Sequence, residues 1–209
     1  MGERGRFITF EGIDGAGKST QIGSLASLAG ELGHEVLVTR EPGGTPLGEK
    51  IRALLLNDSM TVDAETLLFF AARAEHVQKK ILPALEQGMW VLSDRFTDAT
   101  YAYQVGGKSI EAARVEALEA WALKGFKPDL TVLFDLSPET AARRRAKREC
   151  SLHEAADRFE RESFEFFARV RAAYLARAEH DPERFLVVDA EAAPETIAAQ
   201  IRERVSAWL

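Results

Sequence analysis

The segment with the clearest chemistry is a glycine-rich stretch near the start of the sequence. Residues 12–19 read Gly-Ile-Asp-Gly-Ala-Gly-Lys-Ser and satisfy the phosphate-loop pattern G-x-x-x-x-G-K-[ST]. The glycines let backbone N–H groups turn around a phosphate, and a following helix adds its positive N-terminal end. Lys18 can reach the β- and γ-phosphates of ATP, and the Ser19 hydroxyl can bind Mg²⁺. The predicted nucleotide-binding residues are Gly12, Ile13, Asp14, Gly15, Ala16, Gly17, Lys18, Ser19 and Thr20.

A second set of charged residues stands at the ends of apolar runs. Asp94 and Arg95 follow the run at 89–92 almost directly, and Arg40 ends another such run. The carboxyl ends of strands in an open parallel sheet face the ligand crevice. There Asp94 can hold Mg²⁺ through a water, and Arg95 can bind a phosphate with two nitrogens. With Arg73, these arginines predict a basic inner wall for a second anionic substrate.

Short apolar runs alternate with helical periodicities along the whole chain. Runs rich in β-formers predict strands that are buried on both faces, and apolar residues at steps of three and four predict helices. The alternation predicts an α/β fold with a five-stranded parallel sheet and helices on both faces. Strands are expected at 7–10, 36–38, 89–92, 130–134 and 185–188, and helices at 18–32, 47–56, 62–86, 109–124, from 137 onward, 155–178 and 193–208.

Composition excludes several other classes of protein. The 209 residues include 27 Lys and Arg and 33 Asp and Glu, a net charge of −6, which argues against a nucleic-acid partner. No apolar run is long enough to span a membrane, and the N-terminal residues lack the apolar segment of a signal peptide. A single cysteine, Cys150, excludes an internal disulfide framework. These features predict a cytoplasmic protein.

A signalling GTPase is the first alternative that the phosphate loop leaves open. Guanine selectivity in that class uses an Asn-Lys-x-Asp loop. Here Lys127 and Asp129 supply part of the pattern, but Phe126 stands in the Asn position. The base-reading amide is therefore missing, and this class is disfavoured.

Longer stretches of the chain resemble the thymidylate kinase family, the P-loop nucleoside monophosphate kinases that convert dTMP to dTDP. The resemblance runs almost end to end, and its stretch Arg-Glu-Pro-Gly-Gly-Thr at 40–45 is the most specific one. It implies a three-layer P-loop NTPase fold with a short lid, ATP and dTMP as substrates, Mg²⁺, a place in dTTP synthesis and a homodimer. Residues 1–209 would form one kinase domain. The stretches that carry the resemblance are 10–20, 39–45, 69–73, 93–96, 101–104 and 157–160.

The resemblance also implies how the nucleoside of dTMP is bound. Phe69 should stack on thymine, and Arg73, one helical turn on, should hydrogen-bond the O4 edge; the i, i+4 spacing puts both on one face. Thr100 and Gln104 should lie near the base and the sugar. Tyr103 should lie beneath the deoxyribose, where its ring would crowd a 2′-hydroxyl.

The charged groups near the dTMP phosphate follow from the same resemblance. Arg95 and Arg40 should hold the acceptor phosphate. Asp14 should lie near the sugar 3′-hydroxyl or the metal. Glu41 should either orient one of the arginines or help the metal, and sequence alone does not separate the two.

The phosphate loop carries no arginine, so the resemblance is to the bacterial type, which supplies catalytic arginine from a mobile lid. The lid is expected at about 143–158, where residues 143–148 read Arg-Arg-Arg-Ala-Lys-Arg. Arg148 is the first candidate to contact the transferred phosphoryl group, Arg144 the second and Arg158 a further one. A solvated basic helix face is the alternative interpretation of this run. The predicted catalytic residues are Lys18, Arg95, Arg148 and Arg144.

Two rival functions stay open at this point. One is a kinase for another nucleoside or (deoxy)nucleoside monophosphate, which Phe69, Arg73 and the 40–45 stretch disfavour. The other is a nucleotide-dependent switch or binding module with negligible transfer. That class has no acceptor phosphate to hold, so the inner arginines argue against it.

Overall fold

A five-stranded, all-parallel sheet forms the centre of the computed structural model, which describes residues 4–152, 158–159 and 162–209, the side chains of 148–152 excepted. Every predicted apolar run is a strand, so the predicted sheet is confirmed. In spatial order the strands are β2 (Val36–Arg40), β3 (Trp90–Asp94), β1 (Phe7–Glu11), β4 (Leu130–Asp135) and β5 (Phe185–Asp189).

The strand order brings the predicted chemistry to one edge of the sheet. β1 lies in the middle, between β3 and β4, and all pairings are parallel. Asp94 pairs in register with Phe10 on β1 and with Arg40 on β2. The phosphate loop, which follows β1, therefore starts beside the end of β3.

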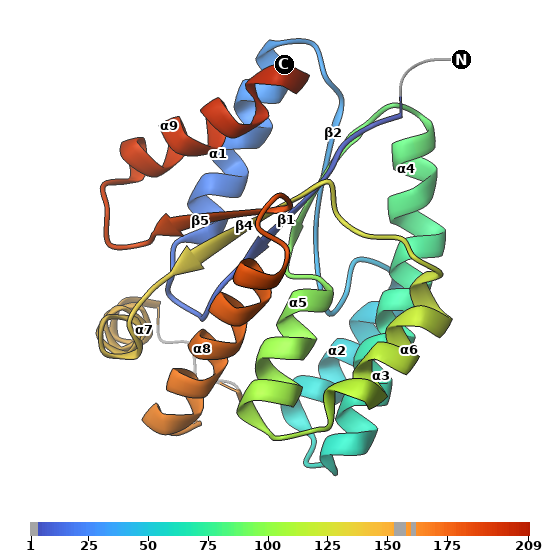
Figure 1. Ribbon diagram of the computed structural model, residues 1–209, viewed down its shortest axis with the longest axis vertical. Coiled ribbons are helices and arrows are strands. Elements are labelled where there is room, and N and C mark those ends of the chain that lie inside the picture. The colour runs from blue at the N-terminus through green and yellow to red at the C-terminus, as the bar shows by residue number, and fades with distance from the viewer. Residues whose placement is uncertain (1–3, 153–157, 160–161) are drawn as a thin grey trace.

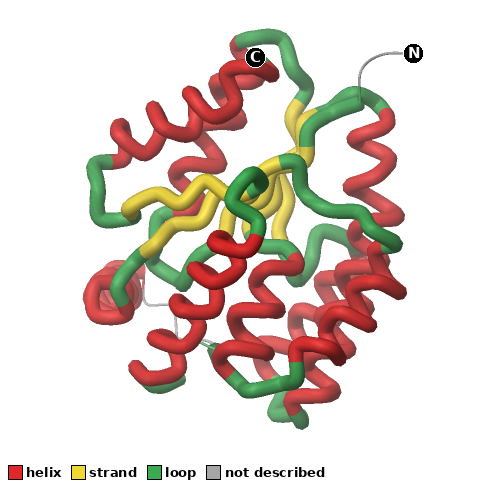
Figure 2. Tube along the Cα trace, viewed as in Figure 1, coloured by secondary structure: helices red, strands yellow, loops and turns green. Residues whose placement is uncertain are grey.

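Helices cover both faces of this sheet, as predicted (Figures 1 and 2). The helices α1 and α9 lie on one face, and α4 and α8 lie on the other, with α3, α5 and α6 packed outside the sheet (Figure 1). The helix predicted over 62–86 is continuous, with a π-helical turn in its middle. The helical bounds are α1 Lys18–Glu31, α2 Pro46–Asn57, α3 Val62–His76, η1 Val77–Ile81, α4 Leu82–Glu86, α5 Thr97–Thr100, η2 Tyr101–Gly107, α6 Ala112–Leu123, α7 Pro138–Leu152, α8 Phe164–His180, α9 Pro194–Val205 and η3 Ser206–Trp208.

Polar caps explain where several helices begin. The Thr45 hydroxyl accepts from the Gly48 N–H at 3.0 Å at the start of α2, and the Ser163 hydroxyl accepts from the Phe166 N–H at 3.2 Å at the start of α8. Such a side chain satisfies one of the free N–H groups of a first helical turn.

The prediction of a helix over 155–178 was wrong at its start, because the Ser163 cap begins α8 at Phe164. Phe159, expected on that helix, lies in a turn instead.

One helical segment was missed by the sequence pattern. α5 and the π-helical η2 run together from Thr97 to Gly107, between β3 and α6, where no helix was expected. Many of the residues that this segment buries are polar, among them Thr97, Asp98, Thr100 and Gln104. A buried polar face leaves no apolar periodicity to detect.

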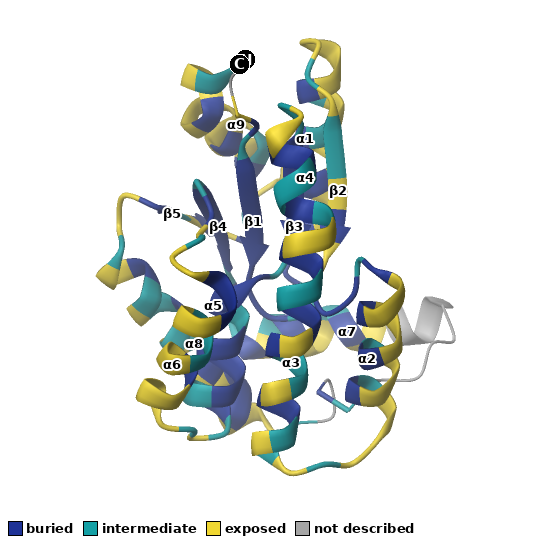
Figure 3. Ribbon diagram, turned by 90° about the vertical axis from the view of Figure 1, so that its right-hand side faces the viewer, coloured by how far each residue is buried: buried dark blue, intermediate teal, exposed yellow. Residues whose placement is uncertain are grey.

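The core lies on both faces of the sheet, and the central strands are buried along their length (Figure 3). On β1, Ile8 and Phe10 face one apolar cluster and Phe7 faces the other, which is the alternation expected of a strand. A rigid β1 fixes the position of the loop that follows it. Among the described helices, none is long and apolar enough to cross a membrane.

Candidate active site

The phosphate loop lies between β1 and α1, as predicted, and its glycines are needed there. Gly12 has φ +134°, and a Cβ atom on it would lie 2.6 Å from the Phe134 carbonyl oxygen. Gly15 and Gly17 also have positive φ, at +88° and +90°. The buried Lys18 opens α1, and its Nζ donates to the Gly12 carbonyl at 3.2 Å. The loop thus curls around its own lysine.

The two predicted metal-binding side chains are of the kind that magnesium prefers. Asp94 Oδ1 is buried and accepts no hydrogen bond within the described residues, although Lys18 Nζ lies 3.8 Å from it. Ser19 is exposed in the first turn of α1. A carboxylate and a hydroxyl beside a phosphate loop are the oxygen ligands that Mg²⁺ prefers.

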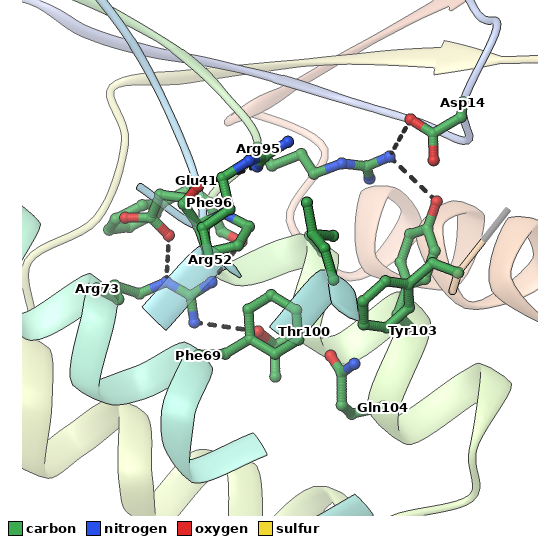
Figure 4. A pocket seen from close by; sticks show the side chains of 14 residues that line it. Asp14, Glu41, Arg52, Phe69, Arg73, Arg95, Phe96, Thr100, Tyr103 and Gln104 are labelled. Atoms are coloured by element: carbon green, nitrogen blue, oxygen red, sulfur yellow. Dashed lines mark hydrogen bonds and ion pairs between the residues drawn. The ribbon is translucent and has the colours of Figure 1, made fainter. Parts of the chain in front are cut away.

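A cavity opens beside this loop, below the ends of β1, β2 and β3 (Figure 4). It brings together all but one of the predicted dTMP-binding residues, the exception being Arg40. Its lining is Asp14, Glu41, Pro42, Arg52, Leu56, Phe69, Arg73, Arg95, Phe96, Ala99, Thr100, Tyr103, Gln104 and Phe159.

Arg73 is held rigidly at one end of the cavity (Figure 4). Its side chain is 2% exposed. Nε donates to Glu41 Oε2 at 2.6 Å, Nη1 to Thr100 Oγ1 at 3.0 Å and Nη2 to the Phe96 carbonyl at 3.0 Å. A guanidinium has five N–H donors, so these contacts leave one on Nη1 and one on Nη2 for a ligand.

The neighbouring phenylalanines divide between cavity and core. Phe69 lines the cavity, four residues before Arg73, whereas Phe70 is 3% exposed and belongs to a core cluster. The Phe69 ring lies 6.0 Å from the Phe159 ring, centroid to centroid. The expected register, with Phe69 and Arg73 on one face, therefore agrees with the structure.

Glu41 stands behind Arg73 and is buried with it. Its second oxygen, Oε1, lies 3.0 Å from His76 Nδ1, and His76 Nε2 lies 2.8 Å from the Thr39 hydroxyl. The carboxylate is thus shared between two buried side chains. Glu41 therefore orients an arginine, but that arginine is Arg73 and not Arg95 or Arg40, the two for which this role was expected.

Arg95 marks the end of the cavity that faces the phosphate loop. Its φ is +70°, a left-handed conformation rare outside glycine, and its N–H donates to the Phe10 carbonyl at 3.0 Å. Nη2 donates to Asp14 Oδ1 at 2.9 Å and to the Tyr103 hydroxyl at 3.1 Å, while Nη1 donates to the Tyr174 hydroxyl at 3.1 Å. One donor on Nη1 and the Nε–H stay available within the described structure.

The ion pair between Arg95 and Asp14 sets the charge of the groups at this end of the cavity. Burial alone would raise the pKa of Asp14, but the charges of Arg95 and Lys18 outweigh it and lower the pKa to about 2. Burial raises the pKa of the Tyr103 hydroxyl well above 10. Asp14 is therefore an anion, and Tyr103 is a neutral phenol, at physiological pH.

Tyr103 and Gln104 line the same cavity as the two arginines. The Tyr103 ring meets the rings of Phe159 and Phe166 edge-on, at 6.3 and 6.0 Å, so it has little freedom to move. Gln104 Nε2 donates to the buried Glu65 at 2.8 Å. Both side chains are fixed before any ligand arrives.

Arg40 lies elsewhere, and another arginine lines the cavity. Arg40 is half exposed, and its Nη2 donates to Glu49 at 2.9 Å. Arg52, which sequence reasoning missed, faces the cavity from α2, and its Nη1 donates to the Pro42 carbonyl at 3.0 Å. The available signal was the spacing of Arg52 from Gly48, one helical turn earlier on the helix that follows the 40–45 stretch.

The described part of the predicted lid lies against the phosphate loop. Arg144 Nη1 donates to the Gly15 carbonyl at 3.3 Å, and Nη2 donates to the Ala190 carbonyl at 2.9 Å. Arg158 binds Glu65 at 2.6 Å and the Leu55 carbonyl at 3.0 Å. The side chain of Arg148 and most of the expected lid after it, residues 153–157, lie outside the described residues.

Comparisons with known proteins place the chain beside one family. The family model described as thymidylate kinase matches residues 10–201. The chain is 56% identical over 197 residues to the thymidylate kinase of Thiobacillus denitrificans, covering 94% of each chain. It is 54% identical over 198 residues to that of Methylobacillus flagellatus, covering 95% of each. The crystal structure of thymidylate kinase from Ehrlichia chaffeensis superposes with a TM-score of 0.77 at 32% identity, covering 96% of this chain and 98% of that one.

Proposed function

The chain belongs to the thymidylate kinase family and phosphorylates dTMP to dTDP with ATP as donor, and we propose that the two ends of its cavity divide the binding of dTMP between them. The observation that carries this proposal is the placement of Arg73 and Arg95 at opposite ends of one cavity, with Lys18 beyond Arg95.

The thymine ring binds at the Arg73 end. Phe69 offers an aromatic face for stacking, and Arg73 has a free donor on each terminal nitrogen for the O4 edge. Thr100, Gln104 and Tyr103 border the base and the sugar. Because these side chains are already fixed by hydrogen bonds and packing, little ordering is left for the moment of binding.

The acceptor phosphate binds at the Arg95 end. Arg95 is partly buried, with 16% of its side chain exposed, is always charged, and has two N–H donors left for a phosphate. Arg40 binds the same phosphate after it releases Glu49, its partner in the structure. The Arg40–Glu49 pair is exposed, and such a pair contributes at most about 1 kcal/mol to stability. Breaking it therefore costs little free energy.

ATP binds on the other side of Arg95, in the phosphate loop. Lys18 and the loop amides hold the β- and γ-phosphates, and Ser19 and Asp94 hold Mg²⁺, which neutralises phosphate charge when bound. The lid arginines Arg144 and Arg148 neutralise the charge that develops on the transferred group, and the closed lid excludes water. Transfer is direct and in line, without a phosphorylated enzyme.

The enzyme is, in this proposal, a cytoplasmic homodimer. Two large apolar side chains, Leu67 on α3 and Trp121 on α6, are 55% and 77% exposed, and α3 packs against α6. A second copy of the chain would cover this face. Light scattering during gel filtration should give twice the mass of 23.1 kDa, and the monomer mass would contradict the dimer.

The test of the proposed function is ADP release in the presence of ATP and Mg²⁺ with different acceptors. The rate should be highest with dTMP, lower with dUMP, dCMP, dGMP and AMP, and lowest without acceptor. Preference for another monophosphate would overturn the assignment of Phe69 and Arg73 to thymine. ADP release that ignores every acceptor would indicate a nucleotide-binding module.

A further inference from the structure

Two buried polar side chains behind Arg95 have no part in the mechanism above. Tyr174, on α8, is 1% exposed, and Glu11, at the end of β1, is fully buried. Neither side chain lines the cavity. Their sequence positions are 163 residues apart, so the fold alone brings them together.

These side chains close a ring of hydrogen bonds around Arg95. Arg95 Nη1 donates to the Tyr174 hydroxyl at 3.1 Å, and that hydroxyl donates to Glu11 Oε2 at 2.7 Å. The other carboxylate oxygen, Oε1, accepts from the N–H of Phe96 at 2.7 Å. The ring therefore fixes both the guanidinium of Arg95 and the backbone that follows it.

Packing alone does not account for a hydroxyl and a carboxyl in this place. Buried polar groups destabilise a fold unless they are hydrogen-bonded, and the neighbours of Tyr174 in the core cluster include apolar side chains such as Val170. The partners of both groups are Arg95 and its neighbour Phe96. A phenylalanine at position 174 would fill nearly the same volume. It would, however, remove the hydrogen-bond partner that Nη1 of Arg95 has in the Tyr174 hydroxyl.

We propose that Tyr174 and Glu11 are positioning residues that aim the guanidinium of Arg95 at the acceptor phosphate. The inference rests on the proposed function in one respect, the assignment of Arg95 to that phosphate. Asp14 and Tyr103 restrain Nη2, and Tyr174 restrains Nη1. Together they hold the plane of the guanidinium in one orientation, which fixes the directions of the unused Nε and Nη1 donors.

The experiment compares the binding of dTMP and of thymidine, which lacks the phosphate, by isothermal titration calorimetry. Tyr174→Phe should weaken dTMP binding about 10-fold, the effect of one hydrogen bond to a charged group, and change thymidine binding less than about 2-fold. Tyr101→Phe is the matched control, because the Tyr101 hydroxyl donates to Glu119, away from the cavity. It should change neither affinity.

The Arg95→Ala variant separates this inference from the proposed function. It should weaken dTMP binding at least as much as Tyr174→Phe, and adding Tyr174→Phe to it should have no further effect. If Arg95→Ala binds dTMP normally, the assignment of Arg95 to the phosphate is wrong and the inference is overturned with it. If Arg95→Ala weakens dTMP binding and Tyr174→Phe does not, only the inference is overturned.

Equal weakening of dTMP and thymidine by Tyr174→Phe would indicate a packing role and overturn the inference. Glu11→Gln provides a second variant of nearly unchanged volume should Tyr174→Phe not fold. Because glutamine has only one accepting oxygen, it cannot accept from both the Tyr174 hydroxyl and the Phe96 N–H. The same selective loss of dTMP affinity is therefore expected. Unchanged dTMP binding by Glu11→Gln would contradict the proposed ring.

Discussion

Replacing Glu11 with glutamine should change how the stability of the fold depends on pH. Glu11 is fully buried, and burial, together with the nearby Asp98 carboxylate, raises its pKa from 4.5 to about 7; Arg95 and the hydroxyl of Tyr174 act in the opposite direction. The folded chain therefore holds this proton more tightly than the unfolded chain does.

The sign of the effect follows from proton linkage. The favourable contribution of the protonated carboxyl is fully present below pH 4.5 and is lost as the pH rises through 7. A rise of the pKa from 4.5 to about 7 corresponds to roughly 3 kcal/mol of free energy of unfolding. Glutamine cannot ionise, so the variant keeps its stability over the same range.

Urea denaturation at pH 4.5 and pH 8 measures this difference. Relative to the native chain, Glu11→Gln should gain roughly 3 kcal/mol in free energy of unfolding between the two pH values. All other titrating groups are common to both proteins, and the dependence on urea concentration should have the same slope. Parallel pH profiles for the two proteins would refute the argument, because they would show that Glu11 ionises as readily in the folded chain as in the unfolded one.

Three further predictions concern turnover. Lys18→Ala should lower kcat at least about 100-fold, because it removes the charge that the loop holds against the γ-phosphate; near-normal turnover in a folded variant would exclude that role. Tyr103→Ala should narrow the preference for dTMP over its ribonucleotide by roughly 10-fold in steady-state assays, because the ring no longer crowds a 2′-hydroxyl, and an unchanged ratio would count against the steric argument. Asp94→Asn should raise the Mg²⁺ concentration needed for half-maximal rate by roughly 10- to 100-fold; an unchanged Mg²⁺ titration would place the metal elsewhere.

Local patterns in the sequence predicted the five strands and the phosphate loop correctly. Each of the five strands is a short apolar run, and a buried parallel strand is recognisable as such. The phosphate loop was found because its chemistry depends on spacing along the chain, whereas Arg73 was assigned to the base through the resemblance to the thymidylate kinase family. The helix between Thr97 and Gly107 was missed because the residues that it buries are largely polar.

Contacts between residues far apart in the sequence could not be predicted from such local patterns. Tyr174 falls within the helix predicted at 155–178, with no role assigned to it there, yet its hydroxyl joins Glu11 to Arg95. Arg52 and Arg40 are both cations near the same stretch, but only the fold turns Arg52 toward the cavity and Arg40 toward solvent. In each case the partner is set by tertiary packing, which spacing along one helix or strand does not encode.

A crystal structure of the chain with dTMP tests the division of the cavity most directly. We expect the thymine ring against Phe69, its O4 within hydrogen-bond distance of Arg73, and the phosphate on the unused N–H donors of Arg95. The reverse orientation, or a phosphate bound by Arg52 with Arg95 still held only by its protein partners, would contradict this expectation.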